Sequence, residues 1–407
     1  MSNIFKYLIL LILLNNCSLD TKTRIWTDNK EVIKEKNYET KLFIKKEPLS
    51  KQFNSQLKVK LTSRLTNNSL ANNSSNNNGR VNYDGELKKT SKFKFSKIKN
   101  FDYYEPELIF ESDNVIFFNN KGSIIKFDSE SNITWKKNYY NKLEKKLRPV
   151  LTLGKDSKTL IVADNISKYY ALNLDDGSLL WSKYNSSPFN SQIKTHKDKF
   201  FVIDFNNILR CISIKDGAEL WSIKAGDAFI KSQKKLSIIV VNNVVYFNNS
   251  TGDITAVDIN TGIILWQVPT QTSTIYENTF LLETSNIVAN NKMIVFSNNK
   301  NEFYSIDLKT GYIKWKININ SSVQPTIIDN LIFTISNEGY LTIIDSKNGN
   351  LIKVTDIFSL FKEKKRNKIN PIGFLVGKNN IYLTTDHGRL LVIDIESGET
   401  KSIIKIA

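Results

Sequence analysis

Residues 258–266 read DINTGIILW, and near copies of this nine-residue phrase recur along the chain. The clearest copies are NLDDGSLLW at 173–181, SIKDGAELW at 213–221 and DLKTGYIKW at 307–315. With weaker copies included the phrase occurs seven times, at spacings of 38 to 49 residues. A period of this length is typical of repeat proteins in which each copy contributes one supersecondary unit.

Two positions of the phrase are filled by the same residue type in most copies. The glycine position is held by Gly177, Gly217, Gly262, Gly311, Gly349 and Gly398, with Asn132 in the first copy. The position after the turn is held by Trp135, Trp181, Trp221, Trp266 and Trp315, then by Lys353 and Ser402. Glycine tolerates the positive φ of a tight turn. Tryptophan offers a large apolar face and one N–H donor, so we expect each indole to tie its unit to the next.

The segments before each turn have the composition of strands. VVYFNNSTGDITAVD (244–258) shows two runs rich in Val, Ile and aromatic residues, separated by an Asn/Gly turn. One shorter strand before each such hairpin gives four strands in about 44 residues, which describes a β-propeller blade. The sequence therefore predicts an all-β fold, a β-propeller with seven countable blades. Helical repeats do not fit this pattern, and the Trp-Asp dipeptide of WD40 repeats is absent.

Composition and motifs give no sign of catalysis. The net charge is +17, but Lys is spread along the whole chain with Asn and Ile, which indicates a composition bias rather than a nucleic-acid-binding stripe. His196 and His387 have no cysteine or second histidine at ligand spacing, so no metal site is predicted. Cys211 lies in an apolar run and is expected to be a small buried residue. No Walker loop, G-x-S-x-G or H-E-x-x-H motif occurs. We therefore expect no enzyme activity, no cofactor and no nucleic-acid partner.

The N-terminus predicts a secretory signal with a lipid anchor. Residues 1–16 carry one positive charge followed by an apolar run that is too short to span a bilayer as a helix. Cys17, directly after this segment, resembles the lipobox cysteine of bacterial lipoproteins, although Asn16 departs from the small residue usual before it. The resemblance implies cleavage before Cys17 and acylation of its thiol, with palmitate among the acyl groups. Because Ser18 follows, it also implies the periplasmic face of the outer membrane.

The chain is predicted to have three parts. Residues 1–16 form the lipoprotein signal peptide, 17–97 a tether, and 98–407 the propeller. Within the tether, 56–62 (QLKVKLT) alternates like a half-buried strand, and 66–79 is an Asn/Ser-rich segment expected to be a loop or disordered. Two readings stay open: a seven-bladed ring, or an eight-bladed plan with an incomplete last blade, for which 56–62 would be the closing strand.

The Trp-docked repeat resembles the PQQ-type propeller repeat, and together with the lipobox it resembles the BamB family of outer-membrane assembly lipoproteins. This resemblance implies a scaffold that helps β-barrel proteins assemble and insert. Its partner would be the periplasmic domains of the barrel subunit of the insertase, with the chain a monomer within that hetero-complex. The family's partner-binding loops are matched in part by DAFIKSQ, where Ile230 and Lys231 stand in place of a Leu and an Arg, and by FLLETS, where Glu283 stands in place of an Asp.

Two other functions remain open. The propeller could be a periplasmic module that binds another ligand, such as a cell-wall polymer. It could also be a PQQ-dependent dehydrogenase, because those enzymes share the repeat. The chain lacks the adjacent cysteine pair often found in such dehydrogenases and shows no acidic cluster suited to calcium. A basic insertion at 358–370, FSLFKEKKRNKIN, is expected to form a short surface helix, either solvated or in contact with acidic lipid or an acidic partner.

Overall fold

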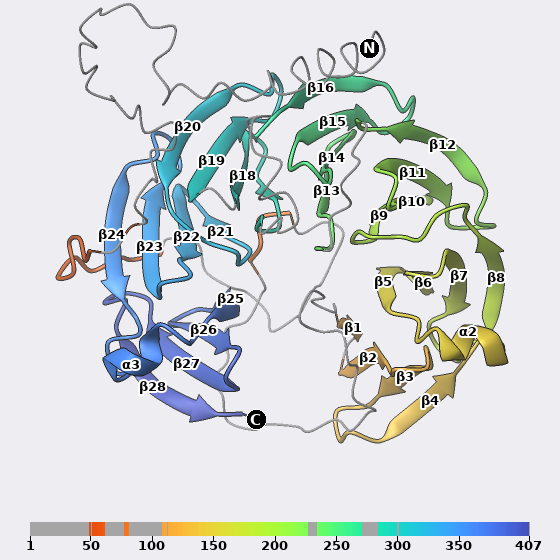
Figure 1. Cartoon of the computed structure of the whole chain (residues 1–407), viewed down its shortest axis with the longest axis horizontal. Coiled ribbons are helices and arrows are strands. Elements are labelled where there is room, and N and C mark those ends of the chain that lie inside the picture. Colours follow the sequence, from red (N-terminus) through yellow and green to blue (C-terminus); the bar gives the residue numbers. More distant parts are fainter. Residues whose placement is uncertain are drawn as a thin grey trace, which may run out of the picture. The chain divides into compact units, whose positions relative to one another are not determined.

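The structure is a computed structural model and describes residues 49, 51–61, 77–80, 108–111, 113–226, 234–270, 284–298 and 301–406. The chain divides into two compact units, Met1–Lys45 and Lys46–Ala407, and all the described residues belong to the second. In these residues the strands form seven four-stranded antiparallel sheets, each built from consecutive strands, and Figure 1 shows them side by side around an axis. The predicted all-β propeller with seven blades is confirmed. The signal peptide, Cys17 and most of the tether lie outside the described residues.

The first four blades have the following strands. Blade 1 is β1 (Ile109–Glu111), β2 (Asn114–Phe118), β3 (Ile124–Phe127) and β4 (Ile133–Lys137). Blade 2 is β5 (Leu151–Asp156), β6 (Thr159–Asp164), β7 (Lys168–Asn173) and β8 (Leu179–Tyr184). Blade 3 is β9 (Lys194–His196), β10 (Lys199–Ile203), β11 (Ile208–Ser213) and β12 (Glu219–Lys224). Blade 4 is β13 (Ile238–Val241), β14 (Val244–Asn248), β15 (Ile254–Asp258) and β16 (Ile264–Val268).

The remaining blades continue the same order. Blade 5 is β17 (Val288–Ala289), β18 (Met293–Asn298), β19 (Glu302–Asp307) and β20 (Ile313–Asn318). Blade 6 is β21 (Thr326–Ile328), β22 (Leu331–Ile335), β23 (Tyr340–Asp345) and β24 (Leu351–Asp356). Blade 7 is β25 (Pro371–Val376), β26 (Asn380–Thr385), β27 (Arg389–Asp394) and β28 (Thr400–Lys405). Among the described residues, two short helices lie in connections between blades, α2 (Lys142–Lys146) and α3 (Glu363–Arg366). The latter confirms the surface helix expected in 358–370.

Each blade buries its middle and exposes its rim. The first strand of every blade faces the axis and the fourth lies on the perimeter (Figure 1). The central strands are buried almost throughout, as in β6 and β14, whereas the outer strands β8, β12 and β20 alternate between exposed and half-buried residues. In all seven described blades the pairing of the third and fourth strands shifts register just before the turn. Such a bulge bends and twists the outer strand.

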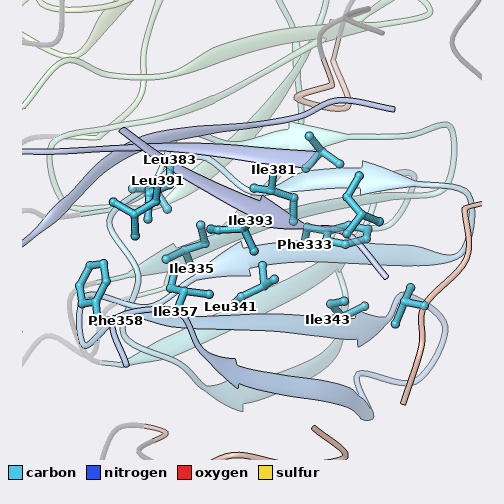
Figure 2. Packing of buried hydrophobic residues seen from close by; sticks show 14 of the residues in the cluster. Phe333, Ile335, Leu341, Ile343, Ile357, Phe358, Ile381, Leu383, Leu391 and Ile393 are labelled. Carbon is cyan, nitrogen blue, oxygen red and sulfur yellow. The ribbon is translucent and has the colours of Figure 1, made fainter. Parts of the chain in front are cut away.

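Hydrophobic clusters join neighbouring blades rather than filling single ones. Six clusters cover the six junctions from blades 1 and 2 to blades 6 and 7. Figure 2 shows the last of these, in which Phe333, Ile335 and Leu341 of blade 6 share one cluster with Ile381, Leu383 and Leu391 of blade 7. Among the described residues no such cluster joins blade 7 to blade 1. Burial of apolar surface between sheets therefore stabilises the ring in a blade-to-blade series.

The repeat tryptophans make these junctions specific. Each indole lies in an outer strand and donates its Nε1–H to a backbone carbonyl of the next blade, at 2.8 to 3.3 Å. Its ring also covers the turn glycine of that blade. A Cβ on Gly177, for example, would lie 2.8 Å from the Trp135 ring, and Gly177 has φ 70°. The glycine is thus required both for the turn and for the approach of the indole. Trp135 is buried and the other four indoles are half-buried.

The first copy of the repeat differs from the prediction by one residue. The left-handed residue of its turn is Ser131, with φ 71°, and not Asn132. The amide of Ser131 donates to the carbonyl of Asp128, three residues back, whereas the Gly177 amide reaches Asn173, four residues back. The first turn is one residue shorter, so counting four residues on from Asp128, as in the other copies, points to Asn132, whereas counting four residues back from Trp135 points to Ser131. The glycine position of the six later copies is confirmed, since all six glycines have φ between 68° and 77°.

The expected closing strand has a different place. Residues 56–61 form no strand, and Phe53 makes one isolated antiparallel bridge with Val354 on the outer strand of blade 6. Val59 is buried in the cluster between blades 6 and 7, and its amide donates to the carbonyl of Glu396. The segment therefore covers the outside of this junction instead of completing a blade. Lys353, at the repeat tryptophan position, donates to the carbonyls of Ser55 and Leu57 at 2.8 and 2.6 Å.

The end of the Asn/Ser-rich segment is ordered. The carbonyls of Asn77 and Asn78 accept from the amides of Ala289 and Ile327, which lie on the first strands of blades 5 and 6. The Asn77 side chain donates to the carbonyl of Val240 in blade 4. Residues 77–80 thus lie along the axis-facing edges of three adjacent blades. Backbone groups make most of these bonds, which explains why the low-complexity composition of 66–79 did not predict them.

Candidate functional site

One face of the propeller carries every long connection. Because the strands of each blade alternate in direction, the links between blades emerge on the same face as the turns between second and third strands. We call this the loop face, and the opposite one, with the turns after first and third strands, the turn face. The links on the loop face include 138–150, 185–193, 225–237, 269–287, 319–325 and 357–370. Among the described residues the connections on the turn face are short turns, so the long connections, which in proteins often carry binding residues, lie on the loop face.

The predicted docking residues fall in two of these links. Ile230 and Lys231 belong to the link from blade 3 to blade 4, and Glu283 to the link from blade 4 to blade 5. All three lie outside the described residues, so their roles remain predictions. The described residues nearest to them show where both segments enter and leave the fold.

The two segments end beside one another. Lys234, the first described residue after 227–233, donates from Nζ to the carbonyl of Thr284, the first described residue after 271–283. The same Nζ lies 3.4 Å from the carbonyl of Ser322 in the link to blade 6. Asn248 donates from Nδ2 to the Thr284 hydroxyl at 3.3 Å. A lysine in a Lys-rich chain carries no signal of such a role, and sequence reasoning missed Lys234.

The segments are also fixed where they begin. The amide of Ala225 donates to the carbonyl of Asn207, and the Ala225 carbonyl accepts from Asn249 Nδ2, both at 3.0 Å. The Thr270 hydroxyl donates to the carbonyl of Gly252 at 2.6 Å, and the Thr270 carbonyl accepts from Asn298 Nδ2 at 3.2 Å. The asparagines come from the second-to-third-strand turns of blades 4 and 5. Both segments thus start and end on rigid elements, a good arrangement for presenting side chains.

A buried polar group holds the loop face near blades 1 and 2. Burial raises the pKa of Asp164 to about 6, and the hydroxyl of Tyr140 donates to its carboxyl at 2.6 Å. Burial likewise raises the pKa of Tyr140. Asp164 also accepts from the amides of Ile166 and Lys168. In the turn of blade 1, Asn119 accepts in the same way from the amides of Lys121 and Ser123. These contacts are those of a turn residue and not of a catalytic acid.

The other titratable residues singled out from the sequence have structural surroundings. Cys211 is fully buried in the cluster between blades 3 and 4, and burial raises the pKa of its thiol to about 12. Burial also lowers the pKa of His196, as do Lys197 and Lys199. His387 contacts Asp386 at an exposed turn. Within the part of the chain that is described, no group of three His, Cys, Asp or Glu is placed to hold a metal ion.

Comparison with known proteins agrees with the Trp-docked propeller. A sequence model of the family "Outer membrane protein assembly factor BamB" matches residues 120–355. The crystal structure of BamB from Moraxella catarrhalis superimposes with a TM-score of 0.61 at 16% identity, covering 74% of this chain and 87% of that one. A computationally designed protein, Ika8, gives 0.56 at 14% identity and covers 74% and 86%. No curated protein sequence matches.

The fold and repeat define a β-propeller whose blades are locked by tryptophan docking. The family match spans more than half of the chain, and the chain therefore belongs to the BamB family of outer-membrane protein assembly factors. The resemblance inferred from the repeat and the lipobox is confirmed at this level. In the described residues, no helix is long and apolar enough to cross a membrane.

Proposed function

We propose that this chain is a non-catalytic, lipid-anchored scaffold that assists the assembly of β-barrel proteins at the periplasmic face of the outer membrane. Membership of the BamB family supports the general role. The observation that carries the proposal is the bond from Lys234 to Thr284, which brings the ends of the two predicted docking segments together on one face. Such a pair of adjacent loops on a rigid scaffold suits protein recognition rather than catalysis.

The axis of the propeller gives further support to a scaffold. In quinone-dependent enzymes with this repeat, the cofactor is held on the propeller axis. Here Asn77–Arg80 of the same chain lies on the axis-facing edges of blades 4 to 6. A Cβ on Gly79 would come within 2.4 Å of the Pro325 carbonyl oxygen, which shows how closely this segment fits against the strands.

The partner in this proposal is the barrel subunit of the insertase, contacted through its periplasmic domains. Lys231 and Glu283 would bind charged groups of that partner, and Ile230 would fill an apolar site. The chain would act as a monomer within the hetero-complex. The exposed outer strands β8, β12 and β20 add edges to which an extended segment could pair.

Co-purification tests the docking segments. We expect Lys231→Glu or Glu283→Lys to reduce the recovered insertase by about tenfold or more, because reversing a charge at an interface places like charges together. Lys347→Glu is the matched control, since Lys347 is exposed on the turn face. The melting temperatures of all three variants should match that of the parent. Equal recovery with every variant would contradict the docking assignment.

Fractionation tests the lipid anchor separately. We expect Cys17→Ser to abolish acylation of the chain, measured by incorporation of labelled palmitate, and to remove it from the outer-membrane fraction. A variant with Cys211→Ser keeps Cys17 and controls for loss of a buried thiol. Unchanged labelling after Cys17→Ser would show that the anchor lies elsewhere, whatever the outcome of the co-purification.

A further inference from the structure

Helix α2 on the loop face buries a charged residue and exposes its leucines. Its only buried residue is Glu144, whereas Leu143 and Leu147 are 72% and 63% exposed. A surface helix normally buries its apolar residues and exposes its charges. The two leucines are one helical turn apart and so share a side of the helix. Lys142, Lys146 and Arg148 beside them are also exposed.

This arrangement is fixed by contacts below the helix. Glu144 accepts from the Tyr184 hydroxyl at 2.6 Å and from Lys168 Nζ at 3.3 Å. It also accepts from the backbone amide of Asn141, whose side chain caps the first turn in return. Burial alone would raise the pKa of Glu144, but the Tyr184 bond, the Asn141 amide and the charge of Lys168 outweigh it, so the pKa is lowered. The carboxylate thus anchors α2 and leaves its leucines facing outward.

The segment around α3 repeats this combination. Phe358 is fully buried and fastens the segment to the core between blades 6 and 7, whereas Leu360 is 61% exposed. Four exposed lysines lie in α3 or directly beside it: Lys362, Lys364, Lys365 and Lys368. Arg366 pairs with Asp356 and holds the helix against blade 6. The only exposed acidic residue of α3 is Glu363.

Both elements lie on the loop face because each lies in a link from an outer strand to the next inner strand. Figure 1 places α2 and α3 on the side of the ring where blades 7 and 1 lie, opposite blades 4 and 5. The predicted docking segments belong to the links from blade 3 to blade 4 and from blade 4 to blade 5. The loop face therefore has a half for the partner proposed above and a second half that combines exposed leucine with lysine.

We propose that α2 and α3 form a contact surface for anionic lipid, seating this half of the loop face on the membrane. Lysines at such a surface are attracted by lipid phosphates, and leucines between them can enter the boundary of the acyl region. The predicted tether supports lipid over an acidic protein as the occupant. From Cys17 to Lys46 the extended chain reaches at most about 100 Å, so the lipid anchor proposed above, on which this step rests, would raise the local concentration of both helices at a bilayer.

Vesicle flotation tests this contact directly. The test uses the chain from Ser18 to Ala407, which lacks the signal and the lipidated cysteine but keeps every described residue. Vesicles of phosphatidylglycerol are compared with vesicles of phosphatidylcholine. We expect binding to the first only, and a loss of about a hundredfold or more in affinity for Lys142→Glu/Lys146→Glu/Lys364→Glu/Lys365→Glu.

A matched control changes the same charge on the other face. Lys215, Lys309, Lys347 and Lys378 are exposed on turns of the turn face, and their change to Glu alters net charge equally. This control should lose less than about tenfold, because charges far from the lipid are screened. Equal losses for the two quadruple variants would show that net charge alone drives binding and would overturn the proposal.

The leucines supply a second, independent test. Leu143→Ser/Leu147→Ser/Leu360→Ser should weaken phosphatidylglycerol binding about tenfold or more even at high salt, where the lysines contribute little. Ile263→Ser/Tyr312→Ser on the turn face is the control, since both side chains are strongly exposed. Capture by soluble polyglutamate without capture by vesicles would identify an acidic protein surface as the partner and refute the lipid assignment. Loss of insertase co-purification alone would leave this result unaffected.

Discussion

The position of the repeat tryptophan is filled differently at the junction between blades 5 and 6 and at the junction between blades 6 and 7. In the first, Trp315 stacks on Phe303, donates to the carbonyl of Ser346 at 3.1 Å and covers Gly349. In the second, Lys353 occupies the equivalent position, and residues 53–59 from the N-terminal part of the chain lie over it. A repeat position can therefore lose its tryptophan when a distant segment supplies the missing cover.

The difference changes what each junction depends on. The tryptophan junction is formed by two neighbouring blades alone, so its stability is local. The lysine junction needs a segment nearly 300 residues away in sequence, and its contacts run from a charged amine to two backbone carbonyls. We expect the lysine junction to lose its packing when residues 53–59 detach. The tryptophan junction should lose its packing only when blades 5 and 6 themselves unfold.

The largest expected effect is at the tryptophan junction. Trp315→Ala should lower the free energy of unfolding by about 3–5 kcal/mol, as large-to-small changes in packed sites do. Trp315→Phe is the control, because it keeps an aromatic ring over Gly349 and loses the N–H donor. It should cost less than half as much in denaturant titration. A cost below about 1 kcal/mol for Trp315→Ala would show that the indole does not lock the blades.

Lys353→Met comes next. Methionine keeps an unbranched stem but cannot donate to Ser55 and Leu57, so we expect a loss of about 1.5–3 kcal/mol, the usual range for bonds to a charged group. Lys353 is fully buried, which keeps these bonds from being replaced by water. Amide exchange should rise in residues 51–61 in this variant and not in Trp315→Phe. Unchanged protection of 51–61 would argue that the lysine does not hold the segment.

Sequence reasoning identified the tryptophan junctions because one residue type recurs at one structural position. The register confirms this, since each repeat tryptophan pairs with the residue just before the bulge, as Trp266 does with Ala256. Lys353 and Ser402 occupy the same register, so the position was right even where the residue changed.

The N-terminal contacts were beyond the same reasoning. Residues 56–62 alternate like a strand, but Val59 is buried between two blades by packing and one backbone bond, with no ladder. Asn77 and Asn78 attach through their own carbonyls, which every residue type possesses. Periodicity predicts which side of an element is buried, but it does not specify where a non-repeating segment docks. For that reason Lys234 was missed as well, and Ile230, Lys231 and Glu283 remain predictions.

The turn glycines allow a finer comparison. Alanine at Gly349 or at Gly398 must adopt a positive φ, at 76° and 71° respectively. At Gly349 the added Cβ would lie 2.7 Å from the Trp315 ring, which Phe303 backs. At Gly398 it would lie 2.7 Å from the Thr355 hydroxyl, which makes no hydrogen bond and can rotate, and 3.1 Å or more from Lys353 Cε and Thr355 Cβ, a looser approach than that to the indole.

We expect Gly349→Ala to cost about 1–2 kcal/mol more than Gly398→Ala, because both share the backbone strain and only the first meets a fixed ring. Chemical denaturation of the two single variants measures this difference. Equal costs would mean that the strain of the turn decides the outcome and that the residue covering the glycine is immaterial.

The smallest expected effect is a pH dependence confined to the lysine junction. Burial lowers the pKa of Lys353 below its ordinary 10.5, against the opposing charges of Glu399 and Asp394. Between the lowered folded pKa and 10.5 the unfolded chain binds a proton that the folded chain does not, so this residue makes stability rise with pH there. Just below pH 10.5 the slope of stability against pH should be smaller in Lys353→Met than in the parent. Trp315→Phe should keep the parent slope, because the groups that Trp315 contacts, the Phe303 ring, the Ser346 carbonyl and Gly349, do not titrate. If Lys353→Met and the parent share one slope, the ammonium keeps its ordinary pKa, and burial at this junction is compensated by the two carbonyls it binds.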